Sequence, residues 1–288
     1  MIMPELPEVA ALAGFLNRRA VGQIVKRIDV ASIQVLKTYD PPPNDLVGRR
    51  LAEVGRHGKF LDLDFEGIHL VIHLARAGWL RWREELPAAP LTTRKHPIAL
   101  RLAFDDGSGF DLTEAGTKKR LAAYLVTDPQ AVPGVASLGI EPLSDEFTLD
   151  AFTELVSGTR QQIKGVLRQQ SLIAGIGNAY SDEVLHAAKL SPFKIAATLS
   201  DAEIARLYEA IGETLRRAVS ESGELAAGEV KAHKKELLRV HGRTGQQCPV
   251  CGDTIREVSF ADSSLQYCPT CQTGGKPLAD RRLSRLLK

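Results

Sequence analysis

The chain contains 288 residues, of which 44% are hydrophobic and 25% are charged, and its formal net charge is +2. A globular chain of this length exceeds what a single core usually serves, so we expect two domains and one smaller module. The sequence shows no signal peptide and no long apolar span, so we expect a protein of the reducing cytoplasm.

The charge is distributed unevenly along the chain. Residues 231–288 contain eleven lysines and arginines against five acids, a balance of +6, whereas residues 1–230 sum to −4. The last basic residues of the chain are Arg281, Arg282, Arg285 and Lys288. Positive charge concentrated in one module gathers phosphates, so the pattern favours a nucleic-acid partner, with a solvated surface as the alternative.

The first half of the chain predicts one helix followed by antiparallel strands. Apolar residues recur at helical spacing from Leu6 to Leu16, and Pro7 lies in the first turn, where a missing N–H is tolerated. Alternating stretches follow at residues 61–65, 68–74 and 98–104. Because turn signals separate these stretches, we expect an antiparallel β-sandwich over residues 1–132.

The second half of the chain predicts helices. A passage with several prolines and glycines, from Pro129 to Pro142, is typical of a linker between domains. The helices expected after it cover residues 148–156, 161–169 and 178–189, and a further helix opens with the capping box Ser200-x-x-Glu203. We therefore expect a helical domain over residues 143–242.

A short glycine-containing turn, Gly175-Ile176-Gly177-Asn178, lies between two of the predicted helices. Its glycines permit a tight turn that leaves the N-terminus of the next helix bare. Backbone N–H groups and the positive end of the helix dipole point outward there, and Asn178 adds a donor, so the turn can hold a phosphate. A turn that serves only packing is an equally common explanation.

The four cysteines of the chain form two Cys-x-x-Cys pairs separated by sixteen residues. They are Cys248, Cys251, Cys268 and Cys271. This spacing predicts a zinc ribbon over residues 243–288, in which two knuckles complete the closed tetrahedron of a structural zinc ion. Two disulfides are the alternative, which a reducing location disfavours.

Three separate segments resemble the formamidopyrimidine-DNA glycosylase and endonuclease VIII family: Pro4-Glu5-Leu6-Pro7-Glu8-Val9, the turn at residues 175–178, and the two cysteine pairs. The resemblance covers essentially the whole chain. It implies an α+β multidomain protein with an N-terminal antiparallel β-sandwich and leading helix, a helix-two-turn-helix domain and a C-terminal zinc ribbon. Damaged double-stranded DNA would lie between the domains of a monomer that needs one structural zinc ion and no nucleotide cofactor.

The resemblance implies four catalytic residues. Pro4 matches the N-terminal proline whose amine attacks the sugar of the damaged nucleotide, and a terminal amine suits this step because its pKa of about 8 leaves it partly neutral. Glu5 matches the acid that protonates the opening sugar ring, and Glu8 matches a second carboxylate that positions the first. For both acids, compensation of the helix dipole is the alternative. Lys59 matches a lysine that contacts the lesion strand and assists proton transfer.

The resemblance also implies residues that contact DNA phosphates and fix the position of the strand without reading its sequence. These residues are Lys164, Asn178, Arg120, Tyr180 and His96. Lys164, Asn178 and Arg120 would clamp the phosphates on either side of the lesion, and Tyr180 would support the turn. For His96, an ordinary surface histidine is the more common explanation.

The chain departs from the family pattern where a side-chain wedge fills the void left by the flipped base. A methionine, an arginine and a phenylalanine of the family are replaced here by Arg76, Lys119 and Leu121. In the zinc finger, Ser263 replaces the arginine that grips the lesion phosphates, and Arg256 is a candidate substitute. The stretch between residues 222 and 237 is shorter than in family members that cap 8-oxoguanine with a long loop. This difference disfavours a preference for 8-oxoguanine.

A further departure lies at the start of the sequence, where Met1-Ile2-Met3 precedes Pro4. In a chain that keeps these residues, the nitrogen of Pro4 is an amide that cannot attack carbon, and another amine such as Lys59 would be needed. We expect translation to begin at Met3, so that removal of this methionine exposes Pro4.

The function that these observations favour is that of a DNA glycosylase with abasic-site lyase activity in base excision repair, acting on oxidised pyrimidines or ring-opened purines. The first alternative is a non-catalytic protein of the same fold that binds lesions or abasic sites. The second is a zinc-ribbon module associated with RNA or the ribosome, which would leave the motif from Pro4 to Glu8 without an explanation.

Overall fold

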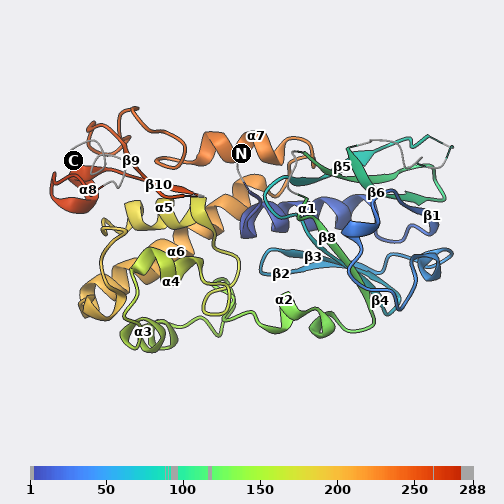
Figure 1. Ribbon diagram of the computed structural model, residues 1–288, viewed down its shortest axis with the longest axis horizontal. Helices are drawn as coiled ribbons and strands as arrows, with labels where there is room; N and C mark the ends of the chain where they lie inside the picture. The colour runs from blue at the N-terminus through green and yellow to red at the C-terminus, as the bar shows by residue number, and fades with distance from the viewer. Residues whose placement is uncertain are drawn as a thin grey trace. The chain divides into compact units, whose positions relative to one another are not determined.

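The computed structural model describes residues 3–87, 89, 91, 97–115, 119–261 and 263–279. The chain forms two compact units: Met1–Leu138 with Val219–Ala232, and Gly139–Ala218 with His233–Lys288 (Figure 1). Within the described ranges, no helix has the length and apolar character needed to cross a membrane.

The first unit is a β-sandwich preceded by helix α1 (Leu6–Arg19). One sheet has the strand order β1–β6–β7–β5 and the other β2–β3–β4–β8, and all neighbouring strands are antiparallel. The strands of the first sheet are β1 (Val25–Val30), β5 (Gly78–Arg83), β6 (Ile98–Phe104) and β7 (Gly109–Glu114). Those of the second sheet are β2 (Glu53–His57), β3 (Phe60–Phe65), β4 (Ile68–His73) and β8 (Ala122–Val126).

The core of the first unit lies between the two sheets. Strand β3 shows how the alternating sequence produces it: Leu61, Leu63 and Phe65 are fully buried on the inner face, and the residues between them point outward. Apolar residues of α1, among them Leu12 and Leu16, belong to the same cluster. The predicted sandwich and its leading helix are therefore confirmed.

The outer face of the second sheet is covered by the passage predicted as a linker. This passage contains the short helix α2 (Pro133–Ala136), whose Val135 packs with Val132 against Val71 and Val126 of the sheet.

Short 3-10 helices occur at Ile33–Val35, Pro43–Leu46, Pro129–Ala131 and Ala196–Thr198. The prolines here start helical turns as well as breaking longer elements.

The second half of the chain is helical up to the zinc finger (Figure 1). Its helices are α3 (Leu149–Ser157), α4 (Ile163–Arg168), α5 (Asn178–Ala187), α6 (Asp201–Ser222) and α7 (Val230–Leu237). The finger contains the hairpin β9 (Arg256–Ser259) and β10 (Ser264–Tyr267) and the short helix α8 (Pro269–Thr273).

The capping box predicted at Ser200 marks the start of α6 correctly, and α3 also begins with a side-chain cap. Thr148 caps α3 by accepting the N–H of Ala151 at 3.2 Å. At α6, the N–H of Ser200 donates to Glu203 Oε2 at 2.9 Å, and the N–H of Glu203 donates to Ser200 Oγ at 3.4 Å. Helix α7 was not predicted, because its charged sequence carries no clear apolar stripe.

Helix α5 is joined to the segment before the finger by a buried carboxylate. Glu183 accepts the backbone N–H groups of Arg239, Val240 and His241 at 2.8, 2.9 and 2.8 Å. Burial raises the pKa of Glu183, and the three N–H donors act in the opposite direction. These bonds satisfy the backbone of the segment that leads into the finger.

We expect Glu183→Gln to lower the free energy of unfolding of the zinc-loaded protein by about 1–3 kcal/mol. The amide nitrogen of glutamine cannot accept a hydrogen bond, so a backbone N–H that one carboxylate oxygen of Glu183 accepts would lose its acceptor. Urea denaturation measures the effect. Glu213→Gln, on an exposed position of α6, is the matched control. Equal stability of the two variants would show that the bonds of Glu183 contribute nothing.

Candidate active site and metal centre

The first turn of α1 carries the two predicted catalytic acids. The backbone N–H of Glu5 donates to Glu8 Oε2 at 2.8 Å, and the carboxylate of Glu5 accepts the backbone N–H of Glu8. Both side chains are only 1% exposed, and Pro4, directly before them, is also buried. This reciprocal pair of hydrogen bonds is a capping box, and it fixes the position of the chain at Pro4.

Lys59 lies in the tight turn between β2 and β3 and is only 8% exposed. Gly58 permits this turn with a φ of +53°. On the neighbouring strand, His73 pairs with Phe60, and their rings lie 4.6 Å apart. Burial, together with the positive charge of Lys59, lowers the pKa of His73 to about 4. The sequence analysis missed this histidine, because only the register of β3 and β4 brings it beside Lys59.

A pH-dependent contribution to stability follows from His73. Its pKa is lower in the folded protein than the ordinary value of 6.5, so unfolding takes up a proton as the pH falls from 6.5 towards 4. As the pH falls through this range, we expect His73 to lower the free energy of unfolding by up to about 1.4 kcal/mol per pH unit. In His73→Gln the free energy of unfolding should fall less steeply by this amount. Urea denaturation at pH 6.5, 5.5 and 4.5 measures the difference, and parallel stability curves would contradict it.

The two loops predicted to carry the wedge are in contact. Arg76 lies exposed in the loop between β4 and β5, and the N–H of Ala115 donates to Ala77 O of this loop at 3.2 Å. A side chain at Gly78 would lie 2.2 Å from Leu74 O and 2.9 Å from Leu121 Cδ1, so this position needs glycine. The structure thus brings the expected wedge loops together.

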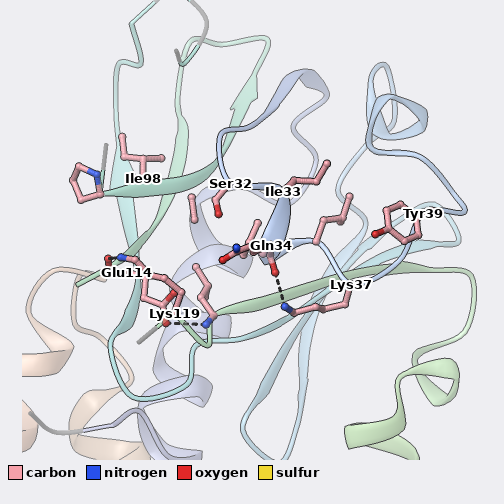
Figure 2. Close-up of a pocket in the computed structure, with 13 residues that line it drawn as sticks. Ser32, Ile33, Gln34, Lys37, Tyr39, Ile98, Glu114 and Lys119 are labelled. Atoms are coloured by element: carbon pink, nitrogen blue, oxygen red, sulfur yellow. Dashed lines mark hydrogen bonds between the residues drawn. The ribbon is translucent and has the colours of Figure 1, made fainter. Parts of the chain in front are cut away.

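The second of these loops is held by Glu114, which is only 4% exposed. Its Oε1 accepts the backbone N–H groups of Arg120 and Leu121 at 2.6 and 2.9 Å. Figure 2 shows Lys119 donating to the backbone oxygen of Glu114, at 2.6 Å, at one end of a pocket of about 590 Å³. Lys37 also lines this pocket. The sequence analysis missed Glu114, which positions this loop.

The expected wedge residues differ in their exposure. Arg76, Lys119 and Arg120 are exposed, whereas Leu121 is 2% exposed and packs in the core of the sandwich. A wedge role for Leu121 stays a prediction and requires its side chain to leave the core. His96, and the four basic residues that end the chain, fall outside the described ranges.

In the second unit, the glycine-containing turn leads directly into α5. Gly175 has a φ of +88°, which glycine adopts without strain. Asn178, the first residue of α5, donates from Nδ2 to Ser264 O at 2.7 Å, and its Oδ1 is buried without a hydrogen-bond partner in the described part of the chain. The turn and the finger hairpin therefore meet at Asn178.

Lys164 lies behind this turn, where it is only 5% exposed. Its Nζ donates to Asn178 O at 3.1 Å, to Ser181 Oγ at 2.7 Å and to Asp182 Oδ1 at 2.6 Å. These contacts hold the first turn of α5. The phosphate contact expected of Lys164 stays a prediction, and the role that these bonds indicate is support of the turn.

A second buried lysine stabilises the same turn. Tyr180 is 2% exposed, and Lys234 Nζ lies 4.7 Å from the centre of its ring, a cation–π contact. Lys234 itself is 2% exposed. A lysine in a charged helix is typical of a surface position, so this contact could not be predicted from the sequence.

The finger is joined to α5 by a further acid. Asp182 Oδ2 accepts Gln266 N at 3.1 Å and lies 2.7 Å from His241 Nδ1. Because Asp182 Oδ1 is already bonded to Lys164, one buried carboxylate connects α4, the segment before the finger and strand β10. At the tip of the β9–β10 hairpin, Ser263 brings no charge, and Arg256 lies exposed on β9.

The four cysteine sulfurs lie within 4.8 Å of one another and form the predicted metal site. Cys248 Sγ and Cys271 Sγ are 3.9 Å apart, and Cys251 Sγ and Cys268 Sγ are 3.3 Å apart. A disulfide would require about 2.05 Å. Zn–S bonds of about 2.3 Å in a tetrahedron place sulfurs about 3.8 Å apart, so the cluster fits zinc. One structural zinc ion is confirmed as the expected cofactor.

His186, in the last turn of α5, adds a contact to this site that the sequence analysis did not find. Its Nε2 lies 3.3 Å from Cys248 Sγ, and the side chain is buried. Burial and the nearby Arg239 lower the pKa of His186, so the ring is neutral. A neutral imidazole that donates its N–H to a metal-bound thiolate orients this ligand and reduces its charge.

We expect His186→Phe to weaken zinc binding by about 10–100-fold, because the aromatic ring is kept while the N–H donor is lost. Competition with a chromogenic chelator measures the change. His186→Gln, which retains an N–H at a similar distance from the backbone, should restore much of the affinity. Unchanged zinc affinity in His186→Phe would show that the hydrogen bond is irrelevant to the metal.

Three family models match consecutive parts of the chain. They are the formamidopyrimidine-DNA glycosylase N-terminal domain over residues 3–120, the formamidopyrimidine-DNA glycosylase H2TH domain over residues 138–227, and the zinc finger found in FPG and IleRS over residues 245–274. The formamidopyrimidine-DNA glycosylase of Symbiobacterium thermophilum is 35% identical to this chain over an alignment 294 residues long. The alignment covers 97% of this chain and 93% of that protein. The chain belongs to the formamidopyrimidine-DNA glycosylase family.

Other comparisons agree with this assignment. An uncharacterized formamidopyrimidine-DNA glycosylase-like protein of Mycobacterium tuberculosis is 55% identical over 156 residues, 54% of this chain and 98% of that protein. The Lactococcus lactis formamidopyrimidine-DNA glycosylase, non-covalently bound to DNA with an abasic site, has a TM-score of 0.80 at 30% identity, over 93% of this chain and 99% of its own. MutM in complex with DNA that contains carbocyclic 8-oxo-G has a TM-score of 0.82 at 30% identity. The match covers 94% of this chain and 100% of MutM.

Family membership confirms the predicted fold of sandwich, helix-two-turn-helix domain and zinc finger. It also makes the chain a glycosylase of the formamidopyrimidine type, which acts in DNA repair.

Proposed function

We propose that the chain is a bifunctional DNA glycosylase and abasic-site lyase that acts on damaged double-stranded DNA as a monomer of the bacterial cytoplasm, with Pro4 as its nucleophile. The observation that carries the proposal is the capping box at the start of α1, which places Pro4 directly beside the buried carboxylates of Glu5 and Glu8. The solved relatives, which bind DNA containing abasic sites or 8-oxo-G, support DNA as the partner.

The reaction begins at the nitrogen of Pro4. Its lone pair forms a bond to C1′ of the damaged nucleotide while the bond from C1′ to the base breaks, and the base leaves with a proton. Opening of the sugar ring gives an iminium ion. The iminium acidifies the hydrogen on C2′, loss of this proton expels the 3′ phosphate, and water then releases the sugar and restores the amine. We assign Glu5 as the donor of the proton to the ring oxygen.

Glu8 is assigned as a positioning residue. Its carboxylate accepts the N–H of Glu5, so it fixes the backbone from which both Pro4 and the Glu5 side chain extend. Lys59 is assigned to the lesion strand, because it is buried in the same unit, next to a histidine that burial keeps neutral. A neutral His73 adds no further positive charge beside Lys59.

The phosphate contacts are assigned to exposed or helix-terminal groups. Arg120 and Lys119 are exposed on the loop that Glu114 holds, and Arg76 is exposed on the neighbouring loop. In the second unit, the N-terminus of α5 at Asn178 carries the positive end of the helix dipole. The lesions that we favour are ring-opened purines and oxidised pyrimidines.

The test is borohydride trapping, in which reduction of the iminium joins the protein covalently to DNA with an abasic site. We expect protein that begins at Pro4 to be trapped, and trapping to vanish in protein that retains Met1-Ile2-Met3, in which the nitrogen of Pro4 is an amide. Lys26→Ala, which removes an exposed charge from β1, should be trapped fully. Undiminished trapping of protein that retains Met1-Ile2-Met3 would assign the nucleophile to another residue.

One alternative is favoured by two specific observations. Ser263 brings no charge to the finger tip, and Leu121 packs inward, so both groups that the family uses to hold an open lesion are altered. A protein with these features can bind abasic or distorted DNA without excising a base. Tight binding to lesion-bearing duplexes without base release or strand cutting, in protein that begins at Pro4, would identify this function.

A further inference from the structure

A second hollow of the first unit has an unusual lining that includes none of the predicted catalytic residues. It has a volume of about 610 Å³ and is bordered by the last turns of α1, by strand β5 and by residues 226–231. Both tryptophans of the chain, Trp79 and Trp82, line it. None of the residues assigned above to excision or to phosphate contact belongs to this lining.

The charge of the hollow is strongly positive. Its basic residues are Arg19, Arg81, Arg83 and Lys231, and its acid is Glu84. Glu84 lies 3.4 Å from the guanidinium of Arg19, but both side chains are more than half exposed, so this ion pair is weak. The remaining basic groups are available to an anion.

Arg81 and Arg83 extend from β5 without a strong partner in the described part of the chain. Arg83 Nε lies 3.8 Å from Asp111 Oδ2, but Asp111 is buried and already bound by two hydrogen bonds, of 2.7 and 3.0 Å, to Arg101. Bidentate Arg–carboxylate pairs of this kind are strong, so Asp111 neutralises Arg101 rather than Arg83. Among the described residues, the side chain of Arg81 has neither an ion pair nor a hydrogen bond.

The two indole rings differ in their hydrogen bonding. Trp79 Nε1 donates to Ala227 O at 3.2 Å, and Lys231 Nζ lies 5.9 Å from its ring centre. Trp82 packs against Phe15 with ring centres 5.8 Å apart, and its Nε1 is buried without a hydrogen-bond partner in the described ranges. A buried donor without an acceptor lowers the stability of the protein.

We infer that this hollow binds a nucleoside phosphate, either as a free nucleotide or as one nucleotide of a single strand. Trp79, Arg81 and Arg83 alternate along β5 with Leu80 and Trp82, and all of them except Leu80 line the hollow. Grooves that combine phosphate-binding cations with aromatic faces for base stacking are typical of proteins that bind single-stranded nucleic acid. The volume lies within the usual range for a small-molecule site.

Intrinsic fluorescence tests this inference directly, because all tryptophan emission of the chain comes from this hollow. The zinc-loaded protein is titrated with deoxyadenosine monophosphate, ATP and a five-nucleotide oligodeoxyadenylate, none of which contains a lesion. We expect saturable quenching. Binding of the oligonucleotide at least tenfold tighter than that of the mononucleotide would identify a strand, and tighter binding of ATP would identify a free nucleotide.

Variants locate the site. Arg81→Ala and Arg83→Ala should each raise the dissociation constant about tenfold, because each removes a charge-assisted hydrogen bond to phosphate. Trp82→Phe should weaken binding while preserving the packing against Phe15. Lys26→Ala removes an exposed charge elsewhere in the same unit and should leave the constant unchanged. Retention of the wild-type melting temperature by Arg81→Ala shows that the fold is intact.

Four outcomes would overturn the inference. They are the absence of saturable quenching with all three probes, equal binding of deoxyribose 5-phosphate and deoxyadenosine monophosphate, tighter binding of an acidic peptide, and unchanged binding in Arg81→Ala. The titration involves no base excision, so its result is independent of whether Pro4 is the nucleophile.

Discussion

The reciprocal hydrogen bonds between Glu5 and Glu8 determine where α1 begins, and the proposed chemistry is positioned from that point. An N-terminal segment is ordinarily mobile, but here the backbone N–H of Glu5 is held by a buried carboxylate, and the helix that follows packs into the core of the sandwich. Pro4 therefore extends from a rigid base. A nucleophilic amine needs this constraint, because misplacement by about 1 Å is enough to slow a reaction substantially.

Helix α5 imposes the corresponding constraint in the second unit. Its first turn carries Asn178 and is held by Lys164, its middle binds the finger through Asp182 and Glu183, and its last turn reaches the metal site through His186. One helix thus connects the candidate phosphate-binding turn with the zinc site. Zinc contributes to folding a finger too small for a core of its own, and through α5 this stability extends to the turn.

Local patterns in the sequence predicted much of the architecture, although they missed α7. Alternation identified strands such as β3, the capping box Ser200-x-x-Glu203 located the start of α6, and the cysteine spacing predicted the metal site, because each signal depends on residues close together in the chain. The surroundings of single side chains could not be predicted in this way. His73 lies beside Lys59 only because of the register between β3 and β4. Lys164 and Lys234 are buried because of acceptors and a ring supplied by α5.

The most direct measurement is to identify the residue that carries the DNA after borohydride trapping. The trapped complex is digested with a protease and a nuclease, and the modified peptide is sequenced by mass spectrometry. We expect a deoxyribose remnant on the nitrogen of Pro4, in the N-terminal peptide. A remnant on a lysine such as Lys59 or Lys234, or trapping by protein that still begins Met1-Ile2-Met3, would contradict it.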